Sequence, residues 1–61
     1  MYLVRKETLG HEVLQRFMAR DMASAERKAQ EWCPGVRLTR DSIFRHGHVD
    51  ETQVTILKVQ A

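Results

Sequence analysis

One stretch of the chain decides the fold: residues 21–35, which read DMASAERKAQEWCPG. Asp21 is typical of a helix N-cap, because its carboxylate can accept hydrogen bonds from backbone N–H groups of the first turn. Helical spacing then separates the residues Ala25, Ala29 and Trp32. Pro34 disfavours helical geometry at the residue before it, and Gly35 follows. The stretch therefore predicts one helix of about 12 residues, roughly 18 Å long.

The sequence before this helix predicts two strands. Residues 2–8 alternate, so that Tyr2, Val4 and Lys6 face one way and Leu3, Arg5 and Glu7 the other. A turn follows at residues 9–11, where Gly10 is free to take a positive φ. Residues 12–20 fit a strand but also a helix, because the apolar residues form a stripe in either geometry. We favour the strand, since Asp21 is the better helix start.

The sequence after the helix predicts two more strands. Residues 36–40 alternate apolar and polar, and this strand can continue through Ile43 and Phe44 after a bend at residues 41–42. Residues 46–51 resemble a polar loop. Residues 52–60 are rich in β-branched residues and predict the last strand.

This order predicts a single α+β domain covering residues 1–61, with a mostly antiparallel sheet and one helix packed on one face. One short helix covers one face of a four-stranded sheet, yet the strands carry apolar residues on both faces. Leu14 and Met18 alternate with Phe17, and Leu57 alternates with Ile56. Because large exposed apolar surfaces mark contact sites, we expect a second copy of the chain to cover this surplus, which makes the protein a homodimer.

Composition limits the class of protein. The chain has 61 residues, 43% of them hydrophobic, which is enough for one domain and too apolar for a disordered chain. No apolar run reaches the roughly 18 residues that span a bilayer, and the N-terminus has no secretory apolar region. The lone Cys33 excludes an intramolecular disulfide and fits a reducing compartment. We therefore expect a cytoplasmic protein without membrane contact.

The chain offers few candidates for catalysis or metal binding. His46 and His48 are the most metal-like pair, with His11 as a distant third ligand, but two histidines in a polar loop are a weak signal. Cys33 lies at the carboxyl end of the predicted helix, where a thiolate is disfavoured, and we expect it to be buried beside Trp32. The carboxylates form no acid–base pair, and no phosphate-binding glycine loop is present. The sequence predicts no cofactor, no metal and no enzymatic activity.

Arginine is the one enriched type of charged residue. Formal net charge is +2, with ten Lys and Arg against eight Asp and Glu. The residues we single out as phosphate or partner contacts are Arg16, Arg20, Arg37, Arg40 and Arg45. Such a small net charge is weak for a nucleic-acid-binding domain, so solvated or interface arginines are the simpler interpretation. Two functions follow: a non-catalytic interaction module, or alternatively an arginine-mediated nucleic-acid-binding module.

Overall fold

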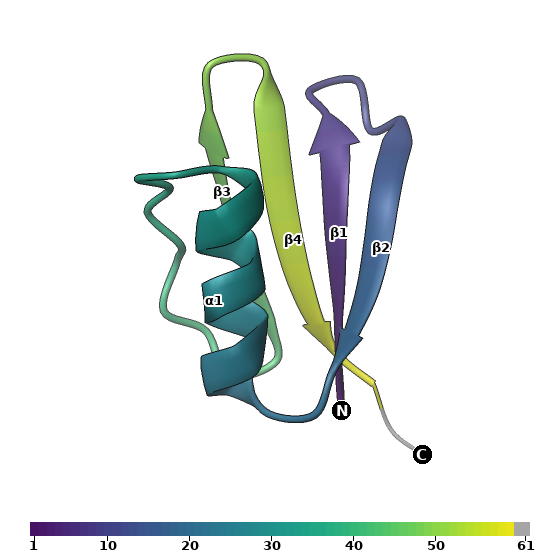
Figure 1. The fold of residues 1–61 in the computed structure, drawn as a ribbon, viewed down its shortest axis with the longest axis vertical. Helices are drawn as coiled ribbons and strands as arrows, with labels where there is room; N and C mark the ends of the chain where they lie inside the picture. The colour runs from purple at the N-terminus through teal and green to yellow at the C-terminus, as the bar shows by residue number, and fades with distance from the viewer. Residues whose placement is uncertain (60–61) are drawn as a thin grey trace.

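The fold was analysed in a computed structural model that describes residues 1–59 (Figure 1). The elements, in chain order, are β1 (Tyr2–Thr8), β2 (Val13–Ala19), α1 (Met22–Trp32), β3 (Phe44–Val49) and β4 (Thr52–Lys58). All neighbouring strands are antiparallel, in the order β2-β1-β4-β3. The helix packs on one face of this sheet, which confirms the predicted α+β class and element order.

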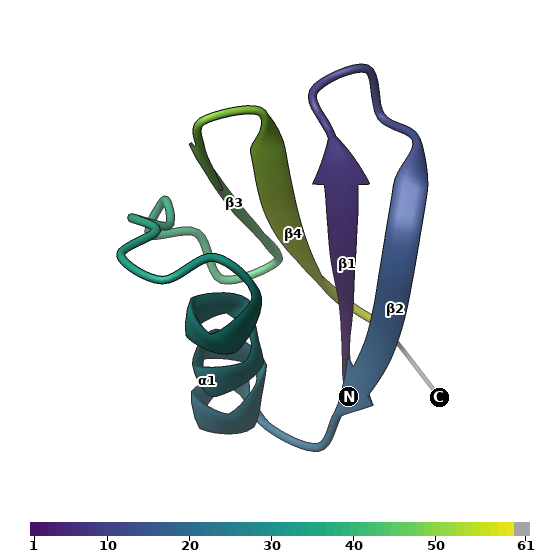
Figure 2. The same cartoon turned by 45° about the horizontal axis from the view of Figure 1, so that its top comes forward.

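The helix begins where the sequence predicts. Asp21 is the N-cap, and its Oδ1 accepts a hydrogen bond from the Ser24 N–H at 2.8 Å. Ala25 and Ala29 are fully buried, because small side chains let the helix backbone lie close to the sheet. Among the described residues the helix contacts β1, β2 and β4 and makes no contact with β3. Figure 2 shows the helix and the sheet as two layers.

A tight turn ends the helix. The Val36 N–H donates to the Cys33 carbonyl at 3.0 Å across Pro34 and Gly35, and Gly35 has φ 84°. Proline followed by a glycine with positive φ is the pattern of a type II turn. Gln30 holds the turn in place, since its Nε2 donates to the Val36 carbonyl at 2.7 Å and its Oε1 accepts from the Gly35 N–H at 3.0 Å.

The core lies between α1 and the sheet. Its buried apolar residues are Val4, Ala19, Ala25, Ala29, Cys33, Val36, Val54 and Ile56. Trp32 and Tyr2 pack against this cluster from its periphery. Most of these side chains are small, so each larger one contributes a substantial share of the buried apolar area.

Residues 13–19 form a strand, as favoured over the helix. Phe17 pairs with Val4 and Met18 with Leu3, so Phe17 lies on the helix side and Met18 on the other. The alternation fails at one point, because a bulge between Lys6 and Glu7 pairs Val13 with Glu7. Strict alternation predicts that Val13 and Phe17 share one face of the sheet. The bulge places Val13 on the opposite face instead.

The first hairpin turn also differs from expectation. His11, and not Gly10, takes the positive φ, at 69°. The His11 N–H donates to the Thr8 carbonyl at 2.9 Å, which holds the turn closed. A left-handed residue is needed in this turn, but its position depends on the bulge that follows.

Two predictions for the second half of the chain are wrong. Residues 36–40 are not a strand: they pack along the margin of the sheet, with Val36 buried and Leu38 partly buried. Residues 46–49, predicted as a loop, belong to β3, and the turn is at residues 50–51. The apolar residues of segment 36–40 alternate because they pack onto the core, although the segment does not pair with a strand. β3 is an edge strand that carries Gly47 on its inner face, so its sequence lacks an apolar pattern.

The last strand is confirmed at Thr52–Lys58. The Val59 N–H donates to the Met1 carbonyl at 2.8 Å just beyond it. The predicted end of this strand, Gln60, lies outside the described residues.

Candidate functional site

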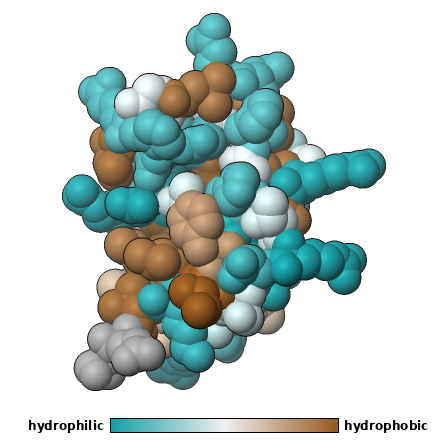
Figure 3. Space-filling model, turned by 180° about the vertical axis from the view of Figure 1, so that it is seen from behind, coloured by the Kyte–Doolittle hydropathy of each residue, from teal (hydrophilic) through white to brown (hydrophobic). Residues whose placement is uncertain are grey.

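The face of the sheet opposite α1 is open, and we call it the helix-free face (Figure 3). Residues directly opposite each other in an antiparallel ladder point to the same side, so the register arranges this face in rows. The apolar row consists of Met18, Leu3, Leu57 and Phe44. The basic row next to it consists of Arg16, Arg5, Thr55 and His46, and the third row of Glu7, Gln53 and His48. Figure 3 shows this face, on which brown apolar side chains gather beside teal polar ones.

The apolar row is accessible at both ends. Met18 is 46% exposed on one edge strand, and Phe44 is 38% exposed on the other. The Phe44 ring lies 5.4 Å from the His46 ring, centroid to centroid. The surplus of apolar residues predicted from the strands is therefore real, and it forms a continuous row across the sheet.

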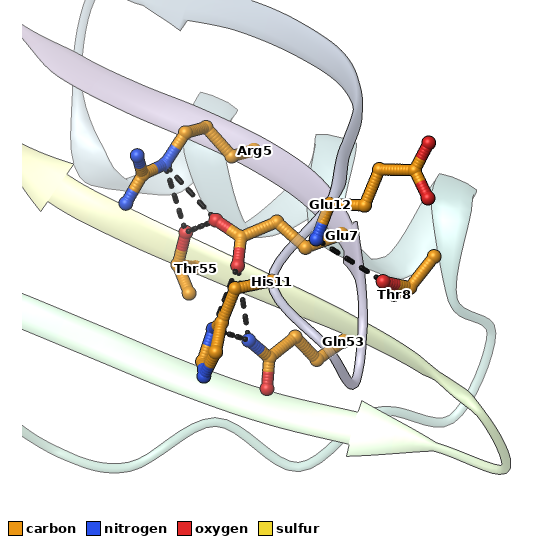
Figure 4. A network of polar contacts seen from close by, with 7 residues as sticks. All are labelled: Arg5, Glu7, Thr8, His11, Glu12, Gln53 and Thr55. Carbon is orange, nitrogen blue, oxygen red and sulfur yellow. Dashed lines mark hydrogen bonds and ion pairs between the residues drawn. The ribbon is translucent and has the colours of Figure 1, made fainter.

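A polar network around Glu7 occupies the end of the face next to the first hairpin turn (Figure 4). The Glu7 residue is only 3% exposed. Its Oε2 lies 3.2 Å from Arg5 Nε and accepts from Thr55 Oγ1 at 3.4 Å. Its Oε1 accepts from Gln53 Nε2 at 3.0 Å and lies 3.4 Å from His11 Nδ1. The network ties β1, β4 and the first hairpin turn together.

The environment of Glu7 keeps its carboxylate charged. Burial by itself raises the pKa of this group. Hydrogen bonds from Gln53 and His11, together with the charge of Arg5, outweigh burial, and the net result is a pKa below the ordinary value of 4.5. The charged carboxylate can therefore accept hydrogen bonds from β4 and from the first hairpin turn at the same time.

The lowered pKa of Glu7 predicts a pH-dependent contribution to stability. A carboxyl group whose folded pKa is depressed stabilises the fold above its unfolded pKa, and this contribution is lost as pH falls through the folded pKa. We expect the wild type to be more stable than Glu7→Gln at neutral pH, and the difference to shrink below about pH 4.5. Urea unfolding of both proteins over a pH series measures this difference in the free energy of unfolding. The contributions of other titrating groups cancel, because both proteins contain them. Parallel pH profiles for the two proteins would contradict this role of Glu7.

The helix-free face carries more positive than negative charge. Among its strand residues Glu7 is the one acidic group, and it is already paired with Arg5. Arg16 lies directly opposite Arg5 in the ladder, and no residue among those described forms an ion pair with Arg16. Like charges directly opposite each other destabilise a strand pair. The face therefore has an uncompensated positive charge beside the apolar row.

The outer edge of β2 is a second candidate surface. The Thr8 N–H bonds the Glu12 carbonyl, and the Val59 N–H bonds the Met1 carbonyl. Since alternate residues of a strand bond to opposite neighbours, β1 residues with even numbers bond to β2 and those with odd numbers to β4. In the register of β1 and β2, the backbone groups of Arg16 and Met18 therefore point to the free edge.

The outer edge of β3 is partly covered. The Thr39 N–H donates to the His46 carbonyl at 3.0 Å, and the His46 N–H donates to Thr39 Oγ1 at 3.2 Å. The segment after α1 lies beside this edge in Figures 1 and 2. Of the two edges of the described sheet, β2 is the one left open.

The five arginines singled out from the sequence do not form one patch. Arg16 lies on the helix-free face and Arg20 follows β2, whereas the other three are on the helix side of the sheet or in the segment after α1. Arg45 forms an ion pair with Glu26 of α1, and its Nε donates to the Asp41 carbonyl at 2.7 Å. Arg40 lines an open groove between α1 and residues 38–42, where acidic side chains also lie.

The remaining sequence candidates have the following positions. His46 and His48 lie exposed on β3 and point to the same face, but residues 1–59 contain no group of three ligating side chains placed to hold a metal. Cys33 is buried at the end of α1, and burial raises the pKa of its thiol although Lys6 acts in the opposite direction.

The sequence did not single out Glu7, Arg5 and Gln53 as a cluster. Alternation alone places Arg5 and Glu7 on the same face of β1, and this was the available signal. Gln53 and Thr55 join them only through the register of β4, which cannot be read from local sequence.

Neither a membrane span in the described part of the chain nor a similar known protein was found. Within residues 1–59, no helix is both long and apolar enough to cross a bilayer. Comparison of the chain with protein-family models, curated proteins and solved structures finds no match.

Proposed function

We propose that this protein is a small non-catalytic interaction module that pairs with a second copy of itself through the edge strand β2. The observation that carries this proposal is the open edge of β2, with the backbone groups of Arg16 and Met18 directed outward. Such an edge is a template for another strand, and proteins usually protect it with lysine, proline or a short strand length. β2 has seven residues and neither lysine nor proline, and Arg16 is its one charged side chain.

The side chains of β2 support pairing. Leu14 is 50% exposed, Met18 46% and Phe17 38%, and the Nζ of Lys28 lies 4.6 Å from the centroid of the Phe17 ring. Strand pairing across this edge would bury part of all three apolar side chains. It would also satisfy backbone groups that otherwise depend on solvent.

The sequence of β2 suits a second copy because one register is self-complementary. A twofold axis at Phe17 places Arg16 opposite the partner's Met18, twice, and lets the outward backbone groups of both residues bond. A twofold axis at Arg16 would instead place two arginines opposite each other, which is unfavourable. The Phe17-centred arrangement joins two sheets into one continuous sheet of antiparallel strands.

Substitutions of opposite charge at Met18 test this pairing. In the Phe17-centred register residue 18 lies opposite the partner's Arg16, so Met18→Lys adds two repulsive pairs per dimer and Met18→Glu adds two attractive ones. We expect Met18→Lys to raise the dimer dissociation constant about tenfold or more, and Met18→Glu to leave the dimer intact. Light scattering on a sizing column across a concentration series measures both.

The control for these variants is Ile43→Lys, because Ile43 is 61% exposed and lies outside the strands. It should leave the mass unchanged. A wild type that stays monomeric at every concentration would overturn the proposal, as would equal effects of lysine and glutamate at residue 18.

A further inference from the structure

We infer that the helix-free face is a binding site for single-stranded nucleic acid, with bases on the apolar row and phosphates on the basic row. This surface shares the side chains of Arg16 and Met18 with the edge of β2, but the inference rests on the face of the sheet and does not depend on the dimer. It rests on the placement of two adjacent rows of unlike chemistry on one exposed face (Figure 3).

The apolar row supplies a stacking platform. Phe44 is 38% exposed, and its ring lies beside the His46 ring. Leu3 and Leu57, each half-buried, continue the row between the two edge strands. Open antiparallel sheets that carry aromatic side chains bind single strands because every base has a face that can stack.

The basic row supplies the charge. Arg5 is paired with Glu7, whereas Arg16 opposite it has no acidic partner among the described residues, so an anion at this position would compensate the charge of Arg16. Within residues 1–59, the other carboxylate side chains lie in turns, in the helix or in the segment after it, and none belongs to a residue of the basic row. Arginine also suits phosphate, because its guanidinium donates two parallel hydrogen bonds.

The spacing of the rows fits a nucleotide strand. Residues two apart on a strand are roughly 7 Å apart, which sets the separation of the apolar and basic rows. A strand of nucleic acid that crosses the β-strands would lay its bases along one row and its phosphates along the other. A free phosphate would leave the apolar row unused. A nucleotide strand uses both rows, because it alternates phosphates with bases that can stack.

Fluorescence anisotropy with labelled single strands tests the inference. The probes are mixed-sequence DNA and RNA of about 12 nucleotides, with the matching duplex as a comparison. We expect the single strands to bind at about 50 mM salt, more tightly than the duplex, with affinity falling as salt rises. Phe44→Ala should weaken binding about 5- to 150-fold through lost stacking.

Two arginine variants separate this face from general charge. Arg16→Ala should lower the slope of log affinity against log salt by about 0.7, the value for one phosphate contact on a single strand. Arg40→Ala removes an equal charge from the helix side of the molecule and should have a much smaller effect. Circular dichroism establishes that each variant is folded.

The inference is overturned if neither single strand binds, if the duplex binds more tightly, or if Arg40→Ala weakens binding as much as Arg16→Ala. It is also overturned if Phe44→Ala leaves the affinity unchanged and instead lowers the mass of the protein in solution, because a second copy would then occupy this face. Phe44→Ala separates the two proposals, because Phe44 lies on β3, at the opposite edge of the sheet from β2. It should weaken single-strand binding and leave the mass of the protein in solution unchanged.

Discussion

Ile56→Ala should leave the protein largely unfolded or close to it. Ile56 is fully buried and is one of the three largest side chains with no exposed surface, the others being Val4 and Val54. Removing a buried isoleucine side chain down to alanine costs about 2–5 kcal/mol, from lost burial and from the cavity that remains. A domain of this length has a total stability of about 3–9 kcal/mol, at roughly 0.05–0.15 kcal/mol per residue. The core of small residues around α1 has little capacity to absorb the loss.

Urea unfolding followed by circular dichroism measures this effect at a fixed protein concentration, since self-association makes stability depend on concentration. Ile56→Val is the matched control, because it removes one methylene at the same site and should cost about 0.5–1.5 kcal/mol. An Ile56→Ala variant with a wild-type midpoint would show that the core is not centred on β4.

Gly47→Ala should destabilise the protein by about 1–3 kcal/mol, the typical cost of overpacking. A Cβ atom at Gly47 would clash with the Arg37 carbonyl oxygen and would lie 2.9 Å from Val36 Cγ2. The first contact is with backbone, so no side-chain rotation relieves it. The segment after α1 must move away from β3, which exposes Val36 and weakens the Thr39–His46 bonds at the edge.

Gly10→Ala is the matched control for this substitution. A Cβ atom at Gly10 would meet only Thr8 Oγ1 at 3.7 Å, an ordinary contact, and Gly10 has no positive φ. We expect its stability to equal or slightly exceed that of the wild type, because alanine restricts the unfolded chain. Thermal unfolding of both variants measures these changes in stability. Equal losses of stability at the two sites would contradict the role of the close contact between Gly47 and the segment after α1.

Local signals in the sequence predicted the elements that have strong end markers or apolar periodicity. Asp21 and the Pro34–Gly35 pair bound α1 because capping and turn geometry act over a few residues. The same signals failed for residues 36–40, whose alternating apolar residues pack on the core as an irregular segment. They also failed for β3, because Gly47 on the inner face of this strand interrupts the apolar alternation.

The candidate surfaces were predictable only in part. Arg16 and the apolar surplus of the strands are visible in the sequence, and alternation puts Arg5 and Glu7 together. The separation of Arg16 from Arg40 and Arg45 was not predictable, because a sequence shows that arginines are numerous without showing which side of the sheet each occupies. His46 and His48 lie on the same face of the sheet because residues 44–49 form a strand, whereas the sequence predicts a loop from residue 46.

The sequence by itself determined the element order, the helix boundaries and the presence of apolar residues on both faces of the strands, since these depend on short-range capping, turn chemistry and periodicity. Only the tertiary structure decided which strands are neighbours and in what register. Register pairs residues far apart in the chain, such as Glu7 with Gln53 and Leu3 with Leu57. The rows of the helix-free face and the open edge of β2 follow from that pairing, because one-residue shifts would move every side chain to the opposite face.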